Sequence, residues 1–282
     1  MRLATIAIDG AWSVAAIRED RCAPLASTGD TVSSMPELAA GGAPGLLRVK
    51  GLVDSMAERD WVPLSGAALG PPVLRPGAIY TIVGNYRDGP ASEAPRPERP
   101  RVLGKLPSSV VRPGAVLRWD TSVTRNVDAE CELGVVIGAP AFRVEDEVAM
   151  DHVFGYTIVN DLNSVDPWLD GEQWLLGKSM AGFCPLGPWI VTADALDPAD
   201  LAQTCIINGQ PIADGRTSQM RFSIAEVVAY ISRHVRLESG DVIAMGTPGR
   251  LASPPGPDRH LAAGDVVTCR IEGIGELTNT IG

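Results

Sequence analysis

Two glutamates, Glu130 and Glu132, open an otherwise apolar segment that runs to residue 138. Because side chains alternate along a strand, both glutamates point to one side, and the apolar residues between them form a core face on the other. A second apolar run, 153–159, is followed closely by Asp161. If the three carboxylates converge, like charges that close need a compensating cation. Oxygen ligands of this kind suit Mg²⁺, Mn²⁺ or Ca²⁺.

A plainer interpretation of the same pair stays open. A Glu-x-Glu strand is also typical of the solvated face of an antiparallel sheet. Two features favour a site instead. Beyond Glu132 the strand is apolar on both faces, with Gly134 and Val136 on the glutamate side, as expected of a central strand. Asp161 likewise ends an apolar strand, and isolated acids at the ends of buried strands are where sites tend to be built.

Charge and composition argue against nucleic acid and membrane partners. The 282 residues carry a formal net charge of −10, and there is no basic run to contact phosphates. No apolar stretch approaches the length of a membrane span. The five cysteines are scattered and never form a Cys-x-x-Cys, which indicates reduced thiols and a cytoplasmic protein. A catalytic thiol at Cys184 is the alternative, but no histidine is near it in the sequence.

The order of apolar runs and turns predicts a β-rich α+β protein with two units. A small N-terminal domain is expected over residues 1–70, with a hairpin of strands at 5–8 and 12–18 and a helix from about 46 to 58. The catalytic domain is expected over residues 71–282. Its strands are predicted near residues 79–84, 131–137, 153–159, 187–192, 203–207, 242–245 and 266–271.

Three shorter features complete this outline. Residues 87–113 are rich in proline and arginine and lack periodicity, which predicts a surface loop that could act as a lid. Asn208-Gly209 predicts a hairpin turn. Apolar residues at helical spacing predict a helix over residues 223–233, with Ser223 as its N-cap and Glu226 as the capping-box partner.

From about residue 72 to the end, the sequence resembles the fumarylacetoacetate hydrolase family. The resemblance rests on several blocks in one order, whereas no single block would be specific. The blocks are Val83-Gly84-Asn85-Tyr86, Lys105-Leu106-Pro107-Ser108-Ser109, residues 130–138, Gly155-Tyr156-Thr157 with Asn160-Asp161, Gly177-Lys178-Ser179, Pro185-Leu186-Gly187-Pro188, Ile207-Asn208-Gly209 and residues 240–248. The first unit looks like the variable N-terminal domain of the same family.

The resemblance implies a twisted, mixed β-roll that usually forms a homodimer. It implies Mg²⁺, Mn²⁺ or Ca²⁺ held by Glu130, Glu132 and Asp161. The substrates that it implies are small 2-oxo acids or 1,3-dicarbonyl compounds, which a metal activates by polarising an enolisable oxo group. Lys178 matches a lysine at the metal site of the family, where its cation would stabilise an oxyanion. A surface lysine beside a turn is the alternative.

Four further residues are expected to contact the substrate. Thr247 lies in a Gly-Thr-Pro turn and would offer its hydroxyl and amide to a substrate carboxylate, although a purely structural turn is the alternative. Val165 and Trp168 stand where many members have an arginine and a glutamine, which indicates a larger or less charged substrate than a small diacid. The four expected substrate contacts are Tyr86, Lys105, Trp168 and Thr247.

The sequence departs from the family where the family activates water. Members usually carry a histidine three residues after the tyrosine and a glutamate three further on, but this chain has Gly89 at the first position and a displaced Glu93. The usual general base is therefore absent. The candidate replacements are His152, Asp88 and Glu93, whereas His260 lies in the loop after the Gly-Thr-Pro turn and is given no role.

The leading hypothesis is a divalent-metal-dependent enzyme that acts on a 2-oxo acid or a 1,3-dicarbonyl compound. By resemblance, its reaction is hydrolysis of a C–C bond. The missing histidine favours the alternative of enolate chemistry without activated water, namely isomerisation, decarboxylation, dehydration or cyclisation. Two other hypotheses are a non-catalytic relative that keeps the metal and a protein that binds no metal.

Overall fold

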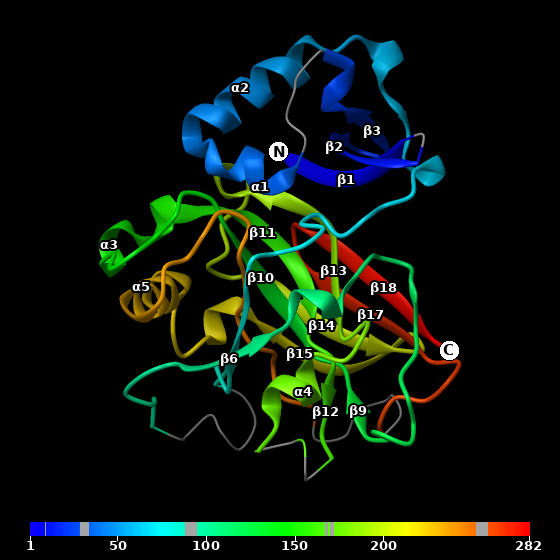
Figure 1. Ribbon diagram of the computed structural model, residues 1–282, viewed down its shortest axis with the longest axis vertical. Helices are drawn as coiled ribbons and strands as arrows, with labels where there is room; N and C mark the ends of the chain where they lie inside the picture. The colour runs from blue at the N-terminus through cyan, green and yellow to red at the C-terminus, as the bar shows by residue number, and fades with distance from the viewer. Residues whose placement is uncertain (9, 29–33, 88–94, 167–168, 170–171, 252–258) are drawn as a thin grey trace.

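The computed structural model describes residues 1–8, 10–28, 34–87, 95–166, 169, 172–251 and 259–282. Within these ranges the chain forms one long sheet, a five-stranded sheet and a two-stranded sheet, with short helices around them (Figure 1). The predicted β-rich α+β class is confirmed. None of the described helices is long and apolar enough to cross a membrane.

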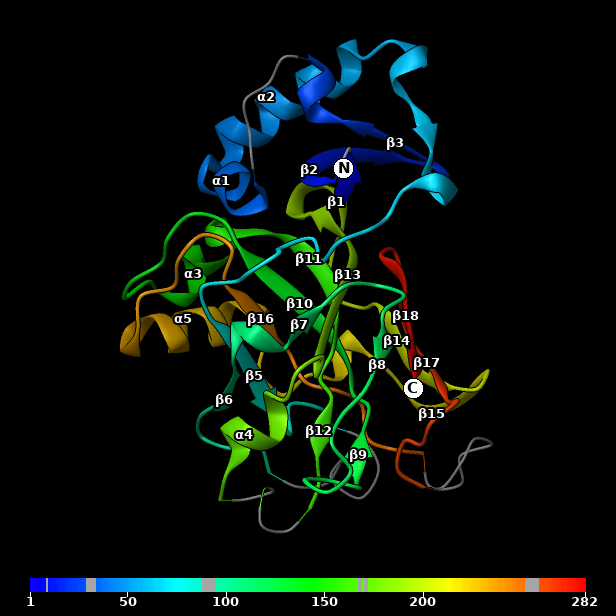
Figure 2. The same ribbon diagram turned by 45° about the vertical axis from the view of Figure 1, so that its right-hand side comes forward.

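The N-terminal strands form the predicted hairpin and then extend it. β1 pairs antiparallel with β2 along its whole length, and β3 and β4 add to the same sheet. Two helices lie beside these strands and contribute Met35, Leu38 and Val49 to their buried core (Figures 1 and 2). The elements are β1 (Arg2–Ile8), β2 (Ala11–Arg18), β3 (Arg21–Pro24), α1 (Met35–Ala40), α2 (Gly42–Ser55) and β4 (Val62–Pro63).

One long sheet crosses the boundary between the two predicted units. Its strand order is β4-β3-β2-β1-β13-β11-β10-β16-β5-β6, and β7 also pairs with β13. The units meet where β1 pairs antiparallel with β13, with Arg2 opposite Val191. The further members are β5 (Ile79–Val83), β6 (Arg101–Lys105), β7 (Val110–Val111), β10 (Cys131–Ile137), β11 (Val153–Asn160), β13 (Cys184–Thr192) and β16 (Val242–Ala244).

The centre of the long sheet is the antiparallel pair of β10 and β11. Every residue of both strands is buried, which confirms that the glutamates enter a central strand. Close packing with β13 depends on Gly155, because a Cβ atom there would lie 2.4 Å from the Val191 carbonyl oxygen. Cys131 lies opposite Asn160, so the beginning of β10 and the end of β11 adjoin.

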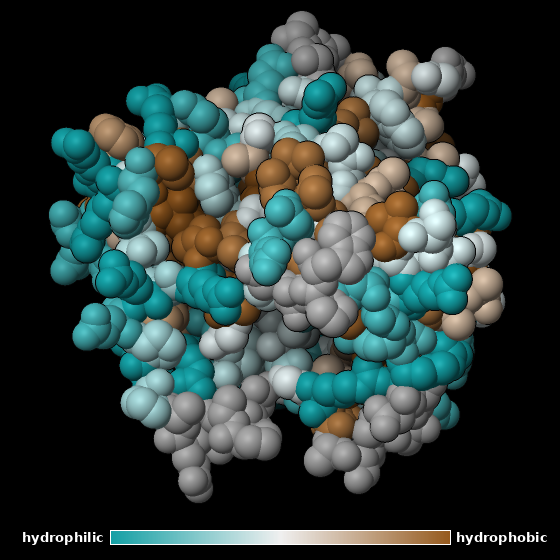
Figure 3. Space-filling model, turned by 60° about the horizontal axis from the view of Figure 1, so that its bottom comes forward, coloured by the Kyte–Doolittle hydropathy of each residue, from teal (hydrophilic) through white to brown (hydrophobic). Residues whose placement is uncertain are grey.

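The remaining elements surround this pair. The five-stranded sheet has the order β15-β14-β17-β18-β8, and α5 begins with the predicted capping box of Ser223 and Glu226. Polar side chains predominate toward the edges of the face shown in Figure 3, and several apolar ones lie nearer its middle. The elements are β8 (Val116–Leu117), β9 (Val127–Asp128), α3 (Asp146–Ala149), β12 (Asn163–Ser164), α4 (Trp174–Lys178), β14 (Ala202–Ile207), β15 (Gln210–Arg216), α5 (Ile224–His234), β17 (Val266–Ile271) and β18 (Gly275–Ile281).

Two predictions about elements are corrected by the structure, and one long strand is additional to those predicted. The span 87–113 is not a continuous loop, because β6 and β7 form within it and β6 pairs with β5. The second helix begins at Gly42, earlier than predicted, because Pro44 is tolerated in a first helical turn. β18 was not predicted, because it alternates polar and apolar residues without an apolar run. The hairpin turn at Asn208-Gly209 is confirmed, with φ values of +52° and +78°.

Asp265→Asn is expected to lower the free energy of unfolding by about 1 kcal/mol at pH 7. Asp265 accepts two hydrogen bonds from Arg259, at 2.7 and 2.8 Å, and these bonds lower its pKa to about 2. A folded-state pKa below the unfolded value stabilises the protein above about pH 4, and this contribution is lost as the pH falls toward 2. Urea denaturation at pH 7 and at pH 3 measures this contribution to the free energy of unfolding.

The exposed Asp54→Asn on α2 is the matched control for this substitution. The difference between the wild-type protein and Asp265→Asn should shrink as the pH is lowered from 7 to 3. A difference that is unchanged over this range would contradict the ionic origin of the stabilisation.

Candidate active site

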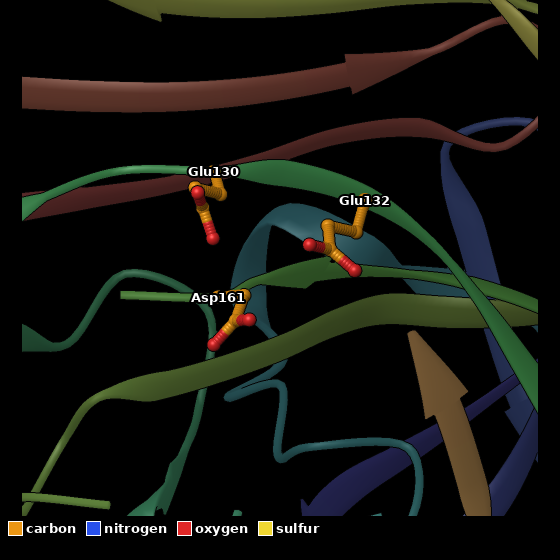
Figure 4. Close-up of side chains that lie close together, drawn as sticks. All are labelled: Glu130, Glu132 and Asp161. Atoms are coloured by element: carbon orange, nitrogen blue, oxygen red, sulfur yellow. The ribbon is translucent and has the colours of Figure 1, made fainter. Parts of the chain in front are cut away.

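The structure brings three carboxylates together at one end of the central strand pair. Glu130 precedes β10, Glu132 is its second residue, and Asp161 directly follows β11. An oxygen of each carboxylate lies within 4.8 Å of the others, and Figure 4 shows the three side chains close together. Glu132 and Asp161 are only 3% and 1% exposed, so the alternative of a solvated strand face does not hold.

Burial makes these carboxylates costly to ionise without a positive partner. Burial, together with the charges of Asp161 and Glu130, raises the pKa of Glu132 well above its ordinary value. Burial also raises the pKa of Glu130, although the Lys178 ammonium opposes this shift. Burial acts in the same direction on Asp161, but the ammonium groups of Lys105 and Lys178 outweigh it and lower the pKa of Asp161. Additional positive charge near Glu130 and Glu132 would therefore favour their ionised forms.

Two buried lysines hold Asp161 from opposite sides. Lys178 Nζ donates to Asp161 Oδ2 at 2.5 Å and to Glu130 Oε2 at 3.2 Å. Lys105 Nζ donates to Asp161 Oδ1 at 2.6 Å and to the Leu162 carbonyl oxygen at 2.9 Å. Burial alone would lower the pKa of Lys178, but the three carboxylates raise it, so this group stays protonated. The alternative of a surface lysine at this position is excluded.

The charge and the donor atoms of this cluster suit a divalent cation. With all five groups ionised, the three carboxylates and the two lysine ammonium groups of this cluster sum to one net negative charge. A divalent cation would change this to one net positive charge, which would attract an anionic substrate. The donors are hard carboxylate oxygens, which Mg²⁺, Mn²⁺ and Ca²⁺ prefer and softer metals do not.

A cavity of about 230 Å³ lies beside the acidic cluster, and all three carboxylates and Lys178 line it. Three buried polar atoms on its wall have no hydrogen-bond partner among the described residues: Thr81 Oγ1, Asn163 Oδ1 and Thr247 Oγ1. Buried polar atoms are ordinarily paired, so these three are available to a bound molecule. The cavity therefore combines a charged end with an uncharged polar wall.

The Gly-Thr-Pro turn supports the cluster through its backbone. Gly246 N donates to Glu132 Oε2 at 2.8 Å. Gly246 has a φ of +92°, and a Cβ atom there would lie 2.9 Å from the Ile82 carbonyl oxygen, so the position requires glycine. The turn thus has a structural role, and Thr247 next to it lines the cavity. A contact between Thr247 and substrate stays a prediction.

Two residues expected to contact substrate lie behind the cavity wall instead. The Tyr86 side chain is buried, and its hydroxyl donates to Gln203 Oε1 at 3.0 Å. The Lys105 side chain is wholly buried, with its ammonium group between Asp161 and the Leu162 carbonyl. Neither residue lines the cavity, so the structure replaces the predicted substrate contacts with supporting roles. Spacing in the sequence could not distinguish the two layers.

His152 does not lie at the site. It immediately precedes β11, whereas Asp161 immediately follows that strand, and eight residues at about 3.3 Å each separate the two ends by roughly 25 Å. Its Nδ1 lies 3.0 Å from the Ala139 carbonyl oxygen. The prediction that His152 replaces the missing base is therefore wrong, because an extended strand carries its two ends to opposite sides. Three other predicted site residues lie outside the described residues: Asp88, Glu93 and Trp168.

Three of the cavity-wall residues that the sequence did not indicate carry polar or aromatic side chains: Thr81, Asn163 and Trp174. Asn163 lies two residues after Asp161, so strand alternation could have placed it on the same side. The other two come from β5 and α4, which reach the site only through tertiary packing. β5 pairs with β16, and β16 pairs with β10, which brings Thr81 near the glutamates.

Comparison with known protein sequences points to one family. The sequence profile of the family "Fumarylacetoacetate (FAA) hydrolase C-terminal" matches residues 78–282. Among curated relatives, "Oxaloacetate tautomerase YisK" of Bacillus subtilis (strain 168) is 39% identical over 224 residues. This alignment covers 78% of the present chain and 74% of the relative. The likeness thus extends over most of both proteins.

Two solved structures match this chain over its full length. A fumarylacetoacetate hydrolase (EaFAH) from psychrophilic Exiguobacterium antarcticum has a TM-score of 0.86 and 30% identity, with coverage of 100% of this chain and 99% of that one. The maleylpyruvate hydrolase from Sphingobium sp. SYK-6, in complex with manganese (II) ion and pyruvate, has a TM-score of 0.80 and 27% identity, with coverage of 100% and 98%. Because the family profile matches residues 78–282 and the named relatives are enzymes, this protein is an enzyme of the fumarylacetoacetate hydrolase family.

Proposed function

We propose that this protein is a divalent-metal-dependent enzyme that interconverts the keto and enol forms of a 2-oxo acid. The observation that carries the proposal is the buried cluster of three carboxylates and Lys178 beside a cavity. With a divalent cation bound, this cluster would have a net positive charge, which would suit an anionic substrate. The relative named oxaloacetate tautomerase supports this reaction, and oxaloacetate is the first substrate to test.

Mg²⁺ is the proposed cation, with Mn²⁺ and Ca²⁺ as alternatives. Glu130, Glu132 and Asp161 would hold it, and it would polarise the 2-oxo group of the substrate. The fit rests on three hard oxygen donors that lie within 4.8 Å of one another. It also rests on the pKa of Glu130 and of Glu132, which burial raises and a nearby cation would lower again. The manganese (II) ion in the maleylpyruvate hydrolase structure supports a divalent ion in this fold.

The remaining groups of the chain can stabilise charge and orient the substrate. The Lys178 ammonium lines the cavity, so it can donate a hydrogen bond to an oxygen that becomes negative during enolisation. Lys105 binds the opposite oxygen of Asp161 and thereby fixes the orientation of that carboxylate. The unpaired oxygens of Thr81, Asn163 and Thr247 can bind other polar atoms of the substrate.

Hydrolysis of a C–C bond is the second candidate reaction. The structural neighbour named maleylpyruvate hydrolase supports it. Hydrolysis requires an activated water as well as groups that stabilise the enolate. No histidine occurs among the described residues that line the cavity, and Gly89 stands where the family carries its histidine. Tautomerisation requires only proton transfer, so it suits the groups of this site better.

Addition of Mg²⁺ to the metal-free protein is expected to accelerate proton exchange at C3 of oxaloacetate. Removal of the metal by a chelator should lower the enzyme-catalysed rate by at least about 100-fold, because the oxo group then loses its Lewis acid. Nuclear magnetic resonance in deuterated water measures the loss of the C3 hydrogen signal directly. Product analysis of the same samples detects any decarboxylation, dehydration or cyclisation.

An acylpyruvate incubated in parallel tests the hydrolytic alternative. Cleavage of the acylpyruvate into two acids, without exchange in oxaloacetate, would favour the hydrolase. If neither reaction occurs with Mg²⁺ bound, both proposed reactions are wrong. Assembly as a homodimer, a cytoplasmic location and the division into residues 1–70 and 71–282 stay predictions.

A further inference from the structure

Positive charge at the cavity is confined to its acidic end. Among the described residues that line the cavity, Lys178 has the one cationic side chain, and its Nζ donates to Asp161 and Glu130. A divalent cation held by the three carboxylates would add positive charge at the same end. The residues outside the described ranges include no lysine, arginine or histidine. A second carboxylate of a bound molecule, away from this end, would therefore be buried without a cation, which is costly.

Thr81 lines the cavity from the same face of the sheet as Glu132, but two strands away. Thr81 of β5 is the partner of Ala244 of β16, which is the partner of Gly134 of β10. Glu132 lies two residues before Gly134, so strand alternation directs both to one face. Two strand spacings amount to roughly 10 Å, and the intervening positions hold an alanine and a glycine. A molecule in the cavity can thus extend from the acidic cluster to the Thr81 hydroxyl.

Asn163 presents a buried acceptor to the same cavity. Asn163 is 7% exposed and Thr81 is 1% exposed. Asn163 Oδ1 and Thr81 Oγ1 both lack a hydrogen-bond partner among the described residues. An amide oxygen can only accept a hydrogen bond, whereas a hydroxyl can donate or accept one. Because an unpaired buried polar atom costs free energy, a ligand that pairs with both atoms removes that cost when it binds.

A primary carboxamide on the ligand matches these two atoms, and a carboxylate does not. The NH₂ group of a carboxamide can donate to Asn163 Oδ1, and its oxygen can accept from the Thr81 hydroxyl. An ionised carboxylate has nearly the same shape, but both of its oxygens only accept. It would set one acceptor against another at Asn163 and would bring a negative charge to a wall that holds no cation among its described residues.

Arg101 offers the alternative of a second cation near the cavity. Its guanidinium carbon lies 5.0 Å from the centroid of the Trp174 ring, and Trp174 lines the cavity. Arg101 is exposed and is not among the described residues of the lining. Its charge is therefore hydrated and stabilises a buried carboxylate less than a cation in the wall would.

We propose that Asn163 and Thr81 select a 2-oxo acid whose far end carries an uncharged primary amide, in preference to one with a second carboxylate. The proposal rests on the proposed tautomerase function and assigns the substrate class of the same site. The preferred substrate is a monoanion, with its 2-oxo acid group at the acidic cluster and its amide at Asn163 and Thr81. Oxaloacetate then differs from the preferred class in one group, the carboxylate that stands in place of the amide.

Proton exchange at C3, compared between oxaloacetate and its 4-carboxamide at saturating Mg²⁺, tests this preference. We expect kcat/KM, divided by the uncatalysed exchange rate of each compound, to be at least about tenfold higher for the carboxamide. The division removes any difference in C–H acidity. Asn163→Leu keeps the size of the side chain without its amide and should abolish the preference by slowing the carboxamide. Thr81→Val, which removes one hydroxyl, should reduce the preference.

Thr157→Val is the matched control for these variants. The Thr157 hydroxyl is also buried without a partner among the described residues, but Thr157 does not belong to the described lining of the cavity. This variant should keep the wild-type preference, and calorimetry should give all of the variants the wild-type affinity for Mg²⁺.

Equal normalised rates for the two compounds, or a preference for oxaloacetate, would overturn the proposal and leave the tautomerase function standing. A preference for oxaloacetate that disappears in Arg101→Met would assign a second carboxylate to Arg101 instead. A preference for the carboxamide that persists in both Asn163→Leu and Thr81→Val would overturn the assignment of these residues, and so would an equal loss of rate with both compounds. Absence of exchange with either compound in the wild-type protein would overturn the tautomerase function as well.

Discussion

Asp161→Asn is expected to abolish the metal-dependent reaction and to weaken Mg²⁺ binding by at least about 100-fold. Asparagine keeps the shape of the side chain but removes one of the three carboxylates. Lys105 and Lys178 each bind one oxygen of Asp161, so the amide nitrogen of asparagine would face an ammonium group and one lysine would lose its acceptor. Calorimetric titration with Mg²⁺ and the proton-exchange assay check this result.

The same substitution is expected to lower the free energy of unfolding of the metal-free protein by about 3 kcal/mol. Lys105 is the reason, because its side chain is wholly buried and Asp161 is its one carboxylate partner among the described ion pairs. Loss of one partner leaves a buried charge without compensation. Relief of repulsion among the carboxylates acts in the opposite direction, but Glu130 already has Lys178 as a partner, so we expect that relief to be smaller.

Urea denaturation measures this loss, and Asp151→Asn, at an exposed aspartate, is the matched control. The control should keep the wild-type stability and the wild-type affinity for Mg²⁺. Undiminished Mg²⁺ binding in Asp161→Asn would contradict the assignment of Asp161 as a ligand. Unchanged stability would contradict the inferred dependence of the buried Lys105 on that carboxylate.

Lys178→Met is expected to lower kcat by about 10²- to 10³-fold while Mg²⁺ still binds. Methionine has a similar length but no charge, so the oxygen that becomes negative during enolisation loses a hydrogen-bond donor. The affinity for Mg²⁺ should be unchanged or higher, because the Lys178 ammonium competes with a cation for Glu130 and Asp161. Steady-state kinetics and calorimetry together separate these two effects.

Lys50→Met on α2 is the matched control, because it removes an exposed lysine from a helix that lies beside the N-terminal strands. It should leave both kcat and Mg²⁺ affinity at wild-type values. If Lys178→Met keeps a wild-type kcat, the ammonium does not stabilise the reaction. If it loses Mg²⁺ binding instead, Lys178 organises the metal site and its catalytic role is not supported.

The acidic cluster was predictable because its pattern is local. Glu130 and Glu132 share a face through strand alternation, and Asp161 ends the next long apolar strand. Antiparallel pairing of two such strands brings the start of one to the end of the other, so convergence of the three carboxylates followed from the order of the elements. The capping box at Ser223 and the turn at Asn208-Gly209 were predictable for the same reason.

The roles of Lys105, Tyr86 and His152 were not predictable from spacing. Lys105 and Tyr86 lie in blocks shared with the family, but their side chains pack behind the cavity wall. His152 adjoins the correct strand at the wrong end. Which layer a side chain enters depends on the neighbouring strands, and the sequence around these residues does not contain that information.

The family resemblance, the β-rich class and the acidic cluster follow from the amino-acid sequence, because each rests on alternation, turn chemistry or order along the chain. Tertiary packing sets which cations neutralise Asp161, and it joins the N-terminal strands to the main sheet through β1 and β13. It also brought His260 to Asp128 across 132 positions of the chain. Local propensity acts over a few residues, whereas contacts between distant segments are set by how whole strands pair and pack.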